Sequence, residues 1–267
     1  MKNDISKRLF VWLRGSASLL SSLEIAILGL SAVAAFAEIP VRQFVAEDFQ
    51  GMGGGVVWES SDVRSTLSSE HAATNGWSLA WRDGGRVCFD ASTSPMAFPD
   101  SATGRVTRVF AVAVCEEAAD HATLFDASCS VRFMPSPFPG DDRTFYESQL
   151  TNAVAVSIDA VDTSLFPSAS ELQVIEAEFI PPCPLNEIYV GGAPATAAWA
   201  QSWRGGVAEL ILLADAPTDA QINALRRYLA LKHGLAVPTE SDGGIVATLA
   251  AMGVDTDGLL NSVFLVK

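Results

Sequence analysis

The segment spanning residues 203–235 constrains the fold most, because it contains one buried strand, one turn and one well-delimited helix in immediate succession. Residues 207–213 are apolar at every position except Glu209, which is the pattern of a strand covered on both faces. The sequence Asp-Ala-Pro at 215–217 then ends the strand. We therefore expect the residues upstream to form the sandwich that this segment closes.

Helix signals follow the turn in the expected order. Thr218 stands at the N-cap position, and Gln221 can complete a capping box with it. Gly234 suits a left-handed C-cap. Apolar residues recur between the caps at helical spacing, namely Ile222, Leu225 and Leu229, with Tyr228 and Leu235 widening the stripe. The sequence predicts a helix from about residue 219 to residue 233.

Apolar and alternating runs upstream indicate β-strands. The clearest is 106–115, and after a turn we expect 122–125 to return beside it as a hairpin. Prolines at 181, 182 and 184 predict a break after residue 179, because proline cannot donate to a ladder. The other expected strands are 39–49, 56–58, 86–92, 131–134, 153–158, 171–179, 187–190 and 260–266.

Several short motifs are similar to the LamG-like, concanavalin A-type jelly-roll domains of secreted bacterial proteins. They are the Trp-Arg-Asp-Gly-Gly turn at 81–85, Phe-Asp-Ala-Ser at 89–92, Tyr-Val-Gly-Gly at 189–192, Gly-Gly at 205–206, Ala-Glu at 208–209 and the helix end Tyr-Leu-Ala-Leu-Lys-His-Gly at 228–234. Ala91 replaces a glycine of the family pattern, which affects only the turn.

The resemblance implies an all-β fold, a two-sheet antiparallel jelly-roll sandwich of the concanavalin A-like type, with one C-terminal α-helix packed on it. It covers residues 56–235. Residues 38–55 would add an N-terminal strand and a glycine-rich joint, and residues 236–267 a C-terminal linker and strand.

Residues 1–37 have the layout of a secretory signal peptide, with a basic start, an apolar stretch and Ala-Phe-Ala at 35–37 before the expected cleavage. Two alternatives remain open. The stretch could stay uncleaved as an anchor, or act as a pilin-like segment, since Glu24 precedes the apolar run. We expect an exported protein that is extracellular or at the cell surface, with the periplasm as the alternative.

The formal net charge of −14 argues against nucleic acid as a partner, because phosphate binding needs a basic patch. It equally disfavours electrostatic binding to anionic membranes, so any membrane contact would come from an uncleaved N-terminal segment. Four cysteines, Cys88, Cys115, Cys129 and Cys183, lack zinc-ligand spacing. Their three disulfide pairings stay open, and Cys88 and Cys115 could equally be buried thiols of apolar strands.

The sequence contains no Glu-x-Asp-x-x-Glu run of the kind that jelly-roll glycosidases use. The nearest carboxylate pair is Glu176 and Glu178, which we interpret as the solvated face of an exposed edge strand. Calcium is the cofactor to test, because Asp141 and Asp142 lie in a Pro-Gly loop and could supply oxygen ligands. Turn chemistry explains the same residues equally well.

Flat aromatic rings match the apolar face of a sugar, so tryptophans in loops are candidate ligand-binding residues. Trp77 and Trp199 are the candidates, whereas Trp81 and Trp203 occupy positions that the resemblance marks as packing anchors. The sequence therefore favours a non-catalytic recognition module that binds carbohydrate or mediates adhesion, with a glycan or a cell-surface protein as its partner. The alternatives are a structural or interaction subunit of an envelope or pilus-like assembly, and an atypical glycoside hydrolase.

Overall fold

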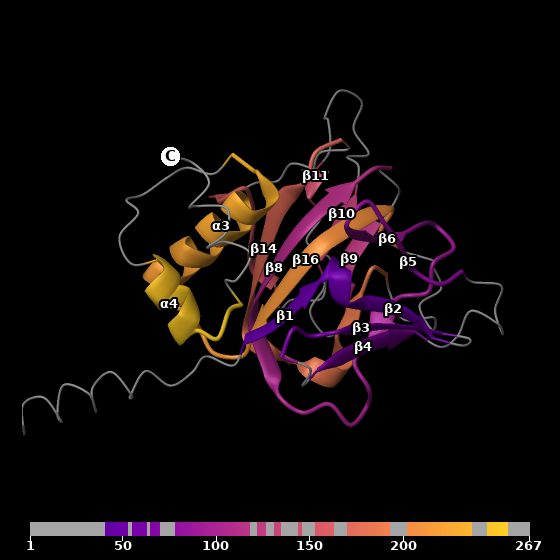
Figure 1. Ribbon diagram of the computed structural model, residues 1–267, viewed down its shortest axis with the longest axis horizontal. Coiled ribbons are helices and arrows are strands. Elements are labelled where there is room, and N and C mark those ends of the chain that lie inside the picture. Colours follow the sequence, from indigo (N-terminus) through magenta and orange to yellow (C-terminus); the bar gives the residue numbers. More distant parts are fainter. Residues whose placement is uncertain are drawn as a thin grey trace, which may run out of the picture. The chain divides into compact units, whose positions relative to one another are not determined.

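Two antiparallel β-sheets pack face to face as a sandwich, and helices near the C-terminus cover one of them (Figure 1). The computed structural model describes residues 41–52, 55–62, 65–69, 78–117, 122–126, 131–134, 144–145, 153–162, 170–192, 202–236 and 245–255. All of these residues lie in the unit from Ile39 to Lys267. The mostly β architecture with a C-terminal helix confirms the predicted fold class.

The first sheet, sheet A, contains the long central strands of the described residues. Its strands are β1 (Val41–Val45), β5 (Trp81–Asp83), β6 (Arg86–Phe89), β8 (Arg105–Cys115), β12 (Ala153–Ile158), β13 (Val161–Asp162), β14 (Gln173–Pro184) and β16 (Gly205–Leu213). They follow the order β13-β12-β14-β8-β16-β6-β5, and β1 also pairs with β16. Every residue of β16 is buried, as its apolar sequence predicts.

The second sheet, sheet B, is built from shorter strands. They are β2 (Phe49–Met52), β3 (Gly55–Glu59), β4 (Thr66–Ser69), β7 (Met96–Ala97), β9 (Ala122–Asp126), β10 (Val131–Met134), β11 (Thr144–Phe145) and β15 (Tyr189–Val190). Their order is β11-β10-β9-β15-β7-β4-β3-β2. Two short 3-10 helices, η1 (Ala46–Asp48) and η2 (Leu185–Glu187), precede β2 and β15.

Large aromatic side chains fill the core between the sheets. The ring of Phe44 packs edge-on against Trp58 and against Phe98, with ring centroids 5.8 Å apart in both pairs. Trp203 is fully buried, and its indole N–H donates to the backbone oxygen of Val114 at 3.1 Å. Trp203 is thus a packing anchor, as predicted.

The outer face of sheet A packs against α3 (Asp219–His233) and is also contacted by residues of α4 (Ile245–Ala251). Thr218 and Gln221 form the predicted capping box, and Gly234 ends α3 in the left-handed conformation. The apolar layer between helices and sheet includes Phe110, Val112, Ile211, Leu225, Leu229 and Leu249. The helix that the sequence predicts at 219–233 is therefore confirmed together with its caps.

Two strand predictions were wrong in their connections. The expected strand 39–49 is divided by η1, so that β1 joins sheet A and β2 joins sheet B. The run 122–125 forms no hairpin with β8, because β8 pairs with β14 and β16 while β9 pairs with β10 and β15. The chain crosses between sheets there, which periodicity alone does not specify.

The predicted break before the prolines was wrong as well, because β14 continues through Pro184. Its pairing with β8 shifts between Glu178 and Cys183, so the prolines lie where the ladder is irregular. Missing N–H donors are tolerated at such positions. The expected strand 260–266 and the N-terminal segment 1–37 lie outside the described residues.

Candidate functional site

Polar side chains interrupt the apolar outer face of sheet A at two places near α3. One row of residues across five strands illustrates this. Its members lie directly opposite one another on neighbouring strands, so their side chains share one face of sheet A. The row runs Gln43, Ile211, Phe110, Glu176 and Ser157. Apolar residues occupy its middle and pack under α3, while a polar cluster lies toward each end.

The first polar cluster surrounds Glu209, whose side chain is fully buried. Its Oε1 atom accepts hydrogen bonds from Gln43 Nε2 at 2.6 Å and from the Tyr228 hydroxyl at 3.2 Å. Its Oε2 atom lies 2.9 Å from Lys232 Nζ and 2.8 Å from His233 Nε2. Burial acts to raise the pKa of Glu209, but the hydrogen bond with His233 and the charge of Lys232 outweigh it and lower the pKa.

The same contacts shift the pKa values of two partners of Glu209, Tyr228 and Lys232. Burial, with the Glu209 charge in addition, raises the pKa of Tyr228 to about 12. Burial acts to lower the pKa of Lys232, but the neighbouring Glu209 charge outweighs it and raises the pKa. At neutral pH the carboxylate is ionised, the ammonium is protonated and the phenol is neutral. This cluster therefore braces α3 against the sheet.

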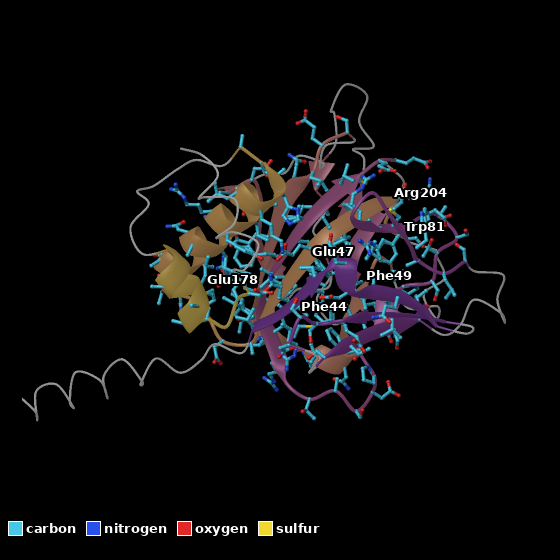
Figure 2. The ribbon with its side chains drawn as sticks, in the orientation of Figure 1. Phe44, Glu47, Phe49, Trp81, Glu178 and Arg204 are labelled. Carbon is cyan, nitrogen blue, oxygen red and sulfur yellow. The ribbon has the colours of Figure 1, made fainter. Side chains whose placement is uncertain are left out.

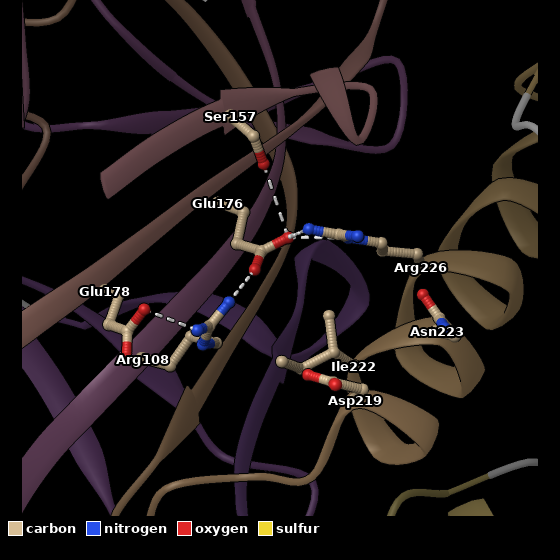
Figure 3. Close-up of a pocket in the computed structure, with 8 residues that line it drawn as sticks. All are labelled: Arg108, Ser157, Glu176, Glu178, Asp219, Ile222, Asn223 and Arg226. Atoms are coloured by element: carbon tan, nitrogen blue, oxygen red, sulfur yellow. Dashed lines mark hydrogen bonds and ion pairs between the residues drawn. The ribbon is translucent and has the colours of Figure 1, made fainter. Parts of the chain in front are cut away.

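The second polar cluster surrounds Glu176, whose side chain is also buried (Figure 3). Its Oε1 atom accepts from Arg108, and its Oε2 atom accepts from Arg226 Nε at 2.7 Å and Nη2 at 2.6 Å. The Ser157 hydroxyl donates weakly to the same Oε2 at 3.4 Å. The guanidinium of Arg108 also reaches Glu178 at 2.7 Å. Four charged side chains thus form two nearly neutral pairs across β14, β8 and α3.

This second cluster opens into a pocket of about 410 Å³ beneath the first two turns of α3, which we call the α3 pocket. Strand residues together with Arg226 form its floor, and the other helix residues form its rim (Figure 3). The lining residues are Arg108, Ser157, Glu176, Glu178, Asp219, Ile222, Asn223 and Arg226. The pocket is small and polar, with Ile222 as the apolar residue of its lining.

The expectation that Glu176 lies on an exposed edge strand was wrong. Strand β14 lies inside sheet A between β12 and β8, and Glu176 is only 3% exposed. The two carboxylates of Glu176 and Glu178 do share a face, as the strand period predicts, but one arginine binds both. Both oxygens of Glu176 are occupied by arginine donors, so the arrangement suits ligand positioning better than acid–base chemistry.

A separate feature lies on the same sheet at β5. Trp81 is 42% exposed and is the aromatic residue among the exposed large apolar side chains of the described part of the chain. Its predicted role as a packing anchor was therefore wrong. Strand β5 is the edge of sheet A next to β6, so one side of the indole has no neighbouring strand to cover it. Figure 2 marks Trp81 on the side of the sandwich away from α3.

Charged side chains lie on the same face of sheet A as Trp81, over β6 and β16. Trp81 is opposite Cys88, which in turn is opposite Gly206, so these three positions form one row. The side chain of Arg86 lies over Gly206, because a Cβ atom added to that glycine would be only 2.9 Å from it. Arg86 Nη1 is 2.8 Å from the Glu116 carboxylate. We call this group, Trp81 with Arg86 and Glu116, the Trp81 face.

All four candidate site residues of the sequence analysis lie outside the described residues. They are the aromatic candidates Trp77 and Trp199 and the calcium candidates Asp141 and Asp142. Each therefore stays a prediction. Within the described ranges, no group of three or more His, Cys, Asp or Glu side chains is arranged to hold a metal ion.

The cysteines divide into two kinds. Cys183 is disulfide-bonded, whereas Cys88 and Cys115 are buried thiols of sheet A. Burial raises the pKa of the Cys88 thiol, which keeps it protonated and unreactive at neutral pH. The alternative that these two cysteines are buried thiols of apolar strands is thus confirmed.

Comparison with known proteins gives no match: no family model, no curated protein and no solved structure matches this chain. The described part of the chain contains no helix that is both long enough and apolar enough to span a membrane.

Proposed function

We propose that the protein is an exported, non-catalytic recognition module that binds carbohydrate through the Trp81 face. The observation that carries the proposal is the exposed Trp81 indole on an edge strand, with the Arg86–Glu116 pair on the same face of the sheet. Stacking on an aromatic ring removes apolar sugar surface from water. The polar side chains beside it can then fix the hydroxyl groups of the ligand.

The composition of the face favours a neutral glycan. Arg86 and Glu116 neutralise one another, so the face brings no excess positive charge for an acidic sugar. The net charge of the whole chain, −14, repels anionic polymers at long range. Guanidinium and carboxylate groups are planar donors and acceptors that match pairs of adjacent hydroxyls.

Export is supported by the sequence of residues 1–37, and by Cys183, because disulfides persist mainly in oxidising compartments. The resemblance to LamG-like jelly rolls and the sandwich fold are consistent with recognition, although a fold by itself does not define a function. A non-catalytic role is supported by the arginine pairing of Glu176 and Glu178.

The test is a glycan array probed with the purified protein, followed by calorimetry on each hit, with calcium and then with chelator. Trp81→Ala should weaken binding by about 5- to 30-fold, since one stacking contact contributes on the order of 1–2 kcal/mol. Trp81→Phe should retain part of the affinity. Leu231→Ala is the matched control, because Leu231 is a comparably exposed apolar residue on α3.

Trp77→Ala and Trp199→Ala belong in the same series, because the sequence nominates both residues. Loss of binding in one of them but not in Trp81→Ala would keep the carbohydrate function and refute the site. Folded protein that binds no glycan would refute the function and favour a structural subunit of an assembly. Sensitivity to chelator would establish the calcium dependence that Asp141 and Asp142 suggest.

A further inference from the structure

The α3 pocket lies away from the Trp81 face and has its own chemistry. Its floor is rigid, because each oxygen of the buried Glu176 already accepts from an arginine. The floor is also electrically balanced, since Arg108 and Arg226 face the carboxylates of Glu176 and Glu178. A ligand in this pocket therefore meets a fixed polar surface whose charges already cancel.

The rim supplies the groups that remain available. Asp219 and Asn223 are four residues apart on α3, so their side chains are neighbours on the face of the helix that lines the pocket. Both side chains are exposed, and neither bonds to another residue in the described part of the chain. Asp219 brings the one uncompensated charge of the lining, and Asn223 brings an amide that can donate and accept.

This distribution of charge selects the class of ligand. An anion would find both guanidinium groups occupied and would meet the charge of Asp219, which offsets the partial positive charge at the N-terminus of α3. A divalent metal ion needs several oxygen ligands at one point, and the described residues contain no such group. A small organic cation needs one carboxylate and neighbouring hydrogen-bond partners, which the rim provides.

We propose that the α3 pocket binds a small polar ligand that presents a protonated primary amine to Asp219 and a second polar group to Asn223. The floor of Glu176, Arg108 and Arg226 keeps α3 at a fixed distance from the sheet and thereby preforms the site. The proposal does not rest on carbohydrate binding, since it involves no residue of the Trp81 face. The amine can belong to a free small molecule or to a lysine side chain of another protein.

The experiment titrates the full chain, labelled with ¹⁵N, with probes of one length and different charge. The probes are 5-aminopentan-1-ol, pentane-1,5-diol and glutarate, together with Nα-acetyl-lysine amide as a mimic of a protein lysine. The amines should shift the Asn223 side-chain signals and the amides of the first turn of α3 saturably, whereas the diol and glutarate should not. Tighter binding of the lysine derivative would identify a protein as the source, and tighter binding of the amino alcohol would identify a free amine.

Two variants with the same change in charge make the test specific. Asp219→Asn should weaken amine binding about fivefold, which is the effect of losing a partly exposed charged hydrogen bond. Asp215→Asn removes one negative charge from an exposed position just outside the pocket and should leave the affinity unchanged. Asn223→Ala provides a second disruption that keeps the carboxylate, and it should also weaken binding.

Three results would overturn the proposal. They are the absence of a saturable shift with either amine, equal affinity for the diol, and equal effects of Asp215→Asn and Asp219→Asn. Trp81→Ala should leave amine binding intact, so a failure of the carbohydrate function and a failure of this site are distinguishable. Circular dichroism of each variant verifies that α3 is retained.

Discussion

The Nζ atom of Lys232 lies 2.9 Å from Oε2 of Glu209, a carboxylate with no solvent exposure in the middle of the buried strand β16. The ammonium comes from the last turn of α3 and is itself partly buried, so the pair connects the end of the helix to the centre of sheet A. Burying a charge is costly unless it is paired and hydrogen-bonded, and Glu209 meets both conditions.

We predict that Glu209→Ala lowers the free energy of unfolding by about 3–5 kcal/mol, because it leaves the partly buried Lys232 ammonium without its carboxylate and removes an acceptor of Gln43. Urea denaturation at pH 7 measures the change. Glu187→Ala is the control, since Glu187 is exposed, and it should change stability by less than about 0.5 kcal/mol. Similar losses in the two variants would show that Glu209 does not brace the helix.

Low pH should lower the free energy of unfolding through Glu209. The pKa of Glu209 in the folded state lies below its ordinary value of 4.5, so the folded state holds its proton less tightly than the unfolded state. The stabilisation is fully present above pH 4.5 and is lost as the pH falls through the lower folded pKa. Unfolding free energies measured from pH 7 to pH 3 should therefore converge for the wild type and Glu209→Gln. A difference that is constant with pH would contradict the prediction.

High pH should lower the free energy of unfolding through Tyr228, whose pKa is raised where that of Glu209 is lowered. Its pKa of about 12 in the folded state lies above the ordinary value of 10.0, so its contribution is complete below pH 10.0 and is lost as the pH rises through about 12. Absorbance of tyrosinate at 295 nm measures the titration. Subtracting the Tyr228→Phe curve from the wild-type curve should give one transition near pH 12. A transition near pH 10 in that difference would refute the raised pKa.

The helix 219–233 was predictable because its signals are local. Thr218, Gln221 and Gly234 act within one turn of the chain, and no distant contact is needed to read them. The apolar run of β16 was predictable for a similar reason, since burial on both faces leaves a continuous apolar sequence.

The position of a strand within its sheet was not predictable, because it depends on partners far away in the sequence. Glu176 was assigned to an exposed edge since two glutamates at alternate positions usually face water, yet β14 is an interior strand. Arg108 is the signal that could have corrected this, because an arginine inside the apolar run 105–115 needs a buried carboxylate partner. Trp81 was misjudged for the same reason, as an edge strand leaves one side of the ring uncovered.

The first glycine of the motif Tyr-Val-Gly-Gly at the end of β15 is required for two reasons. A side chain there has no room, and the backbone is in the left-handed conformation. Gly191 has φ of +80°, and a Cβ atom there would overlap the ring of Phe89. Gly234 has a similar φ of +68° with nothing within 4 Å of the added atom. Both Gly→Ala changes therefore add the strain of a left-handed residue, about 1–2 kcal/mol, but only Gly191→Ala adds overpacking.

We expect Gly191→Ala to destabilise the protein by about 1–3 kcal/mol more than Gly234→Ala in parallel urea titrations. The backbone around Gly191 gives little room for relief, since its N–H donates to Leu124 and its carbonyl accepts from Trp203, at 2.9 and 3.0 Å. The core cannot easily move Phe89 either, because that ring is itself buried. Equal destabilisation by the two substitutions would mean that Phe89 adopts another rotamer at no cost, and that the glycine serves backbone conformation alone.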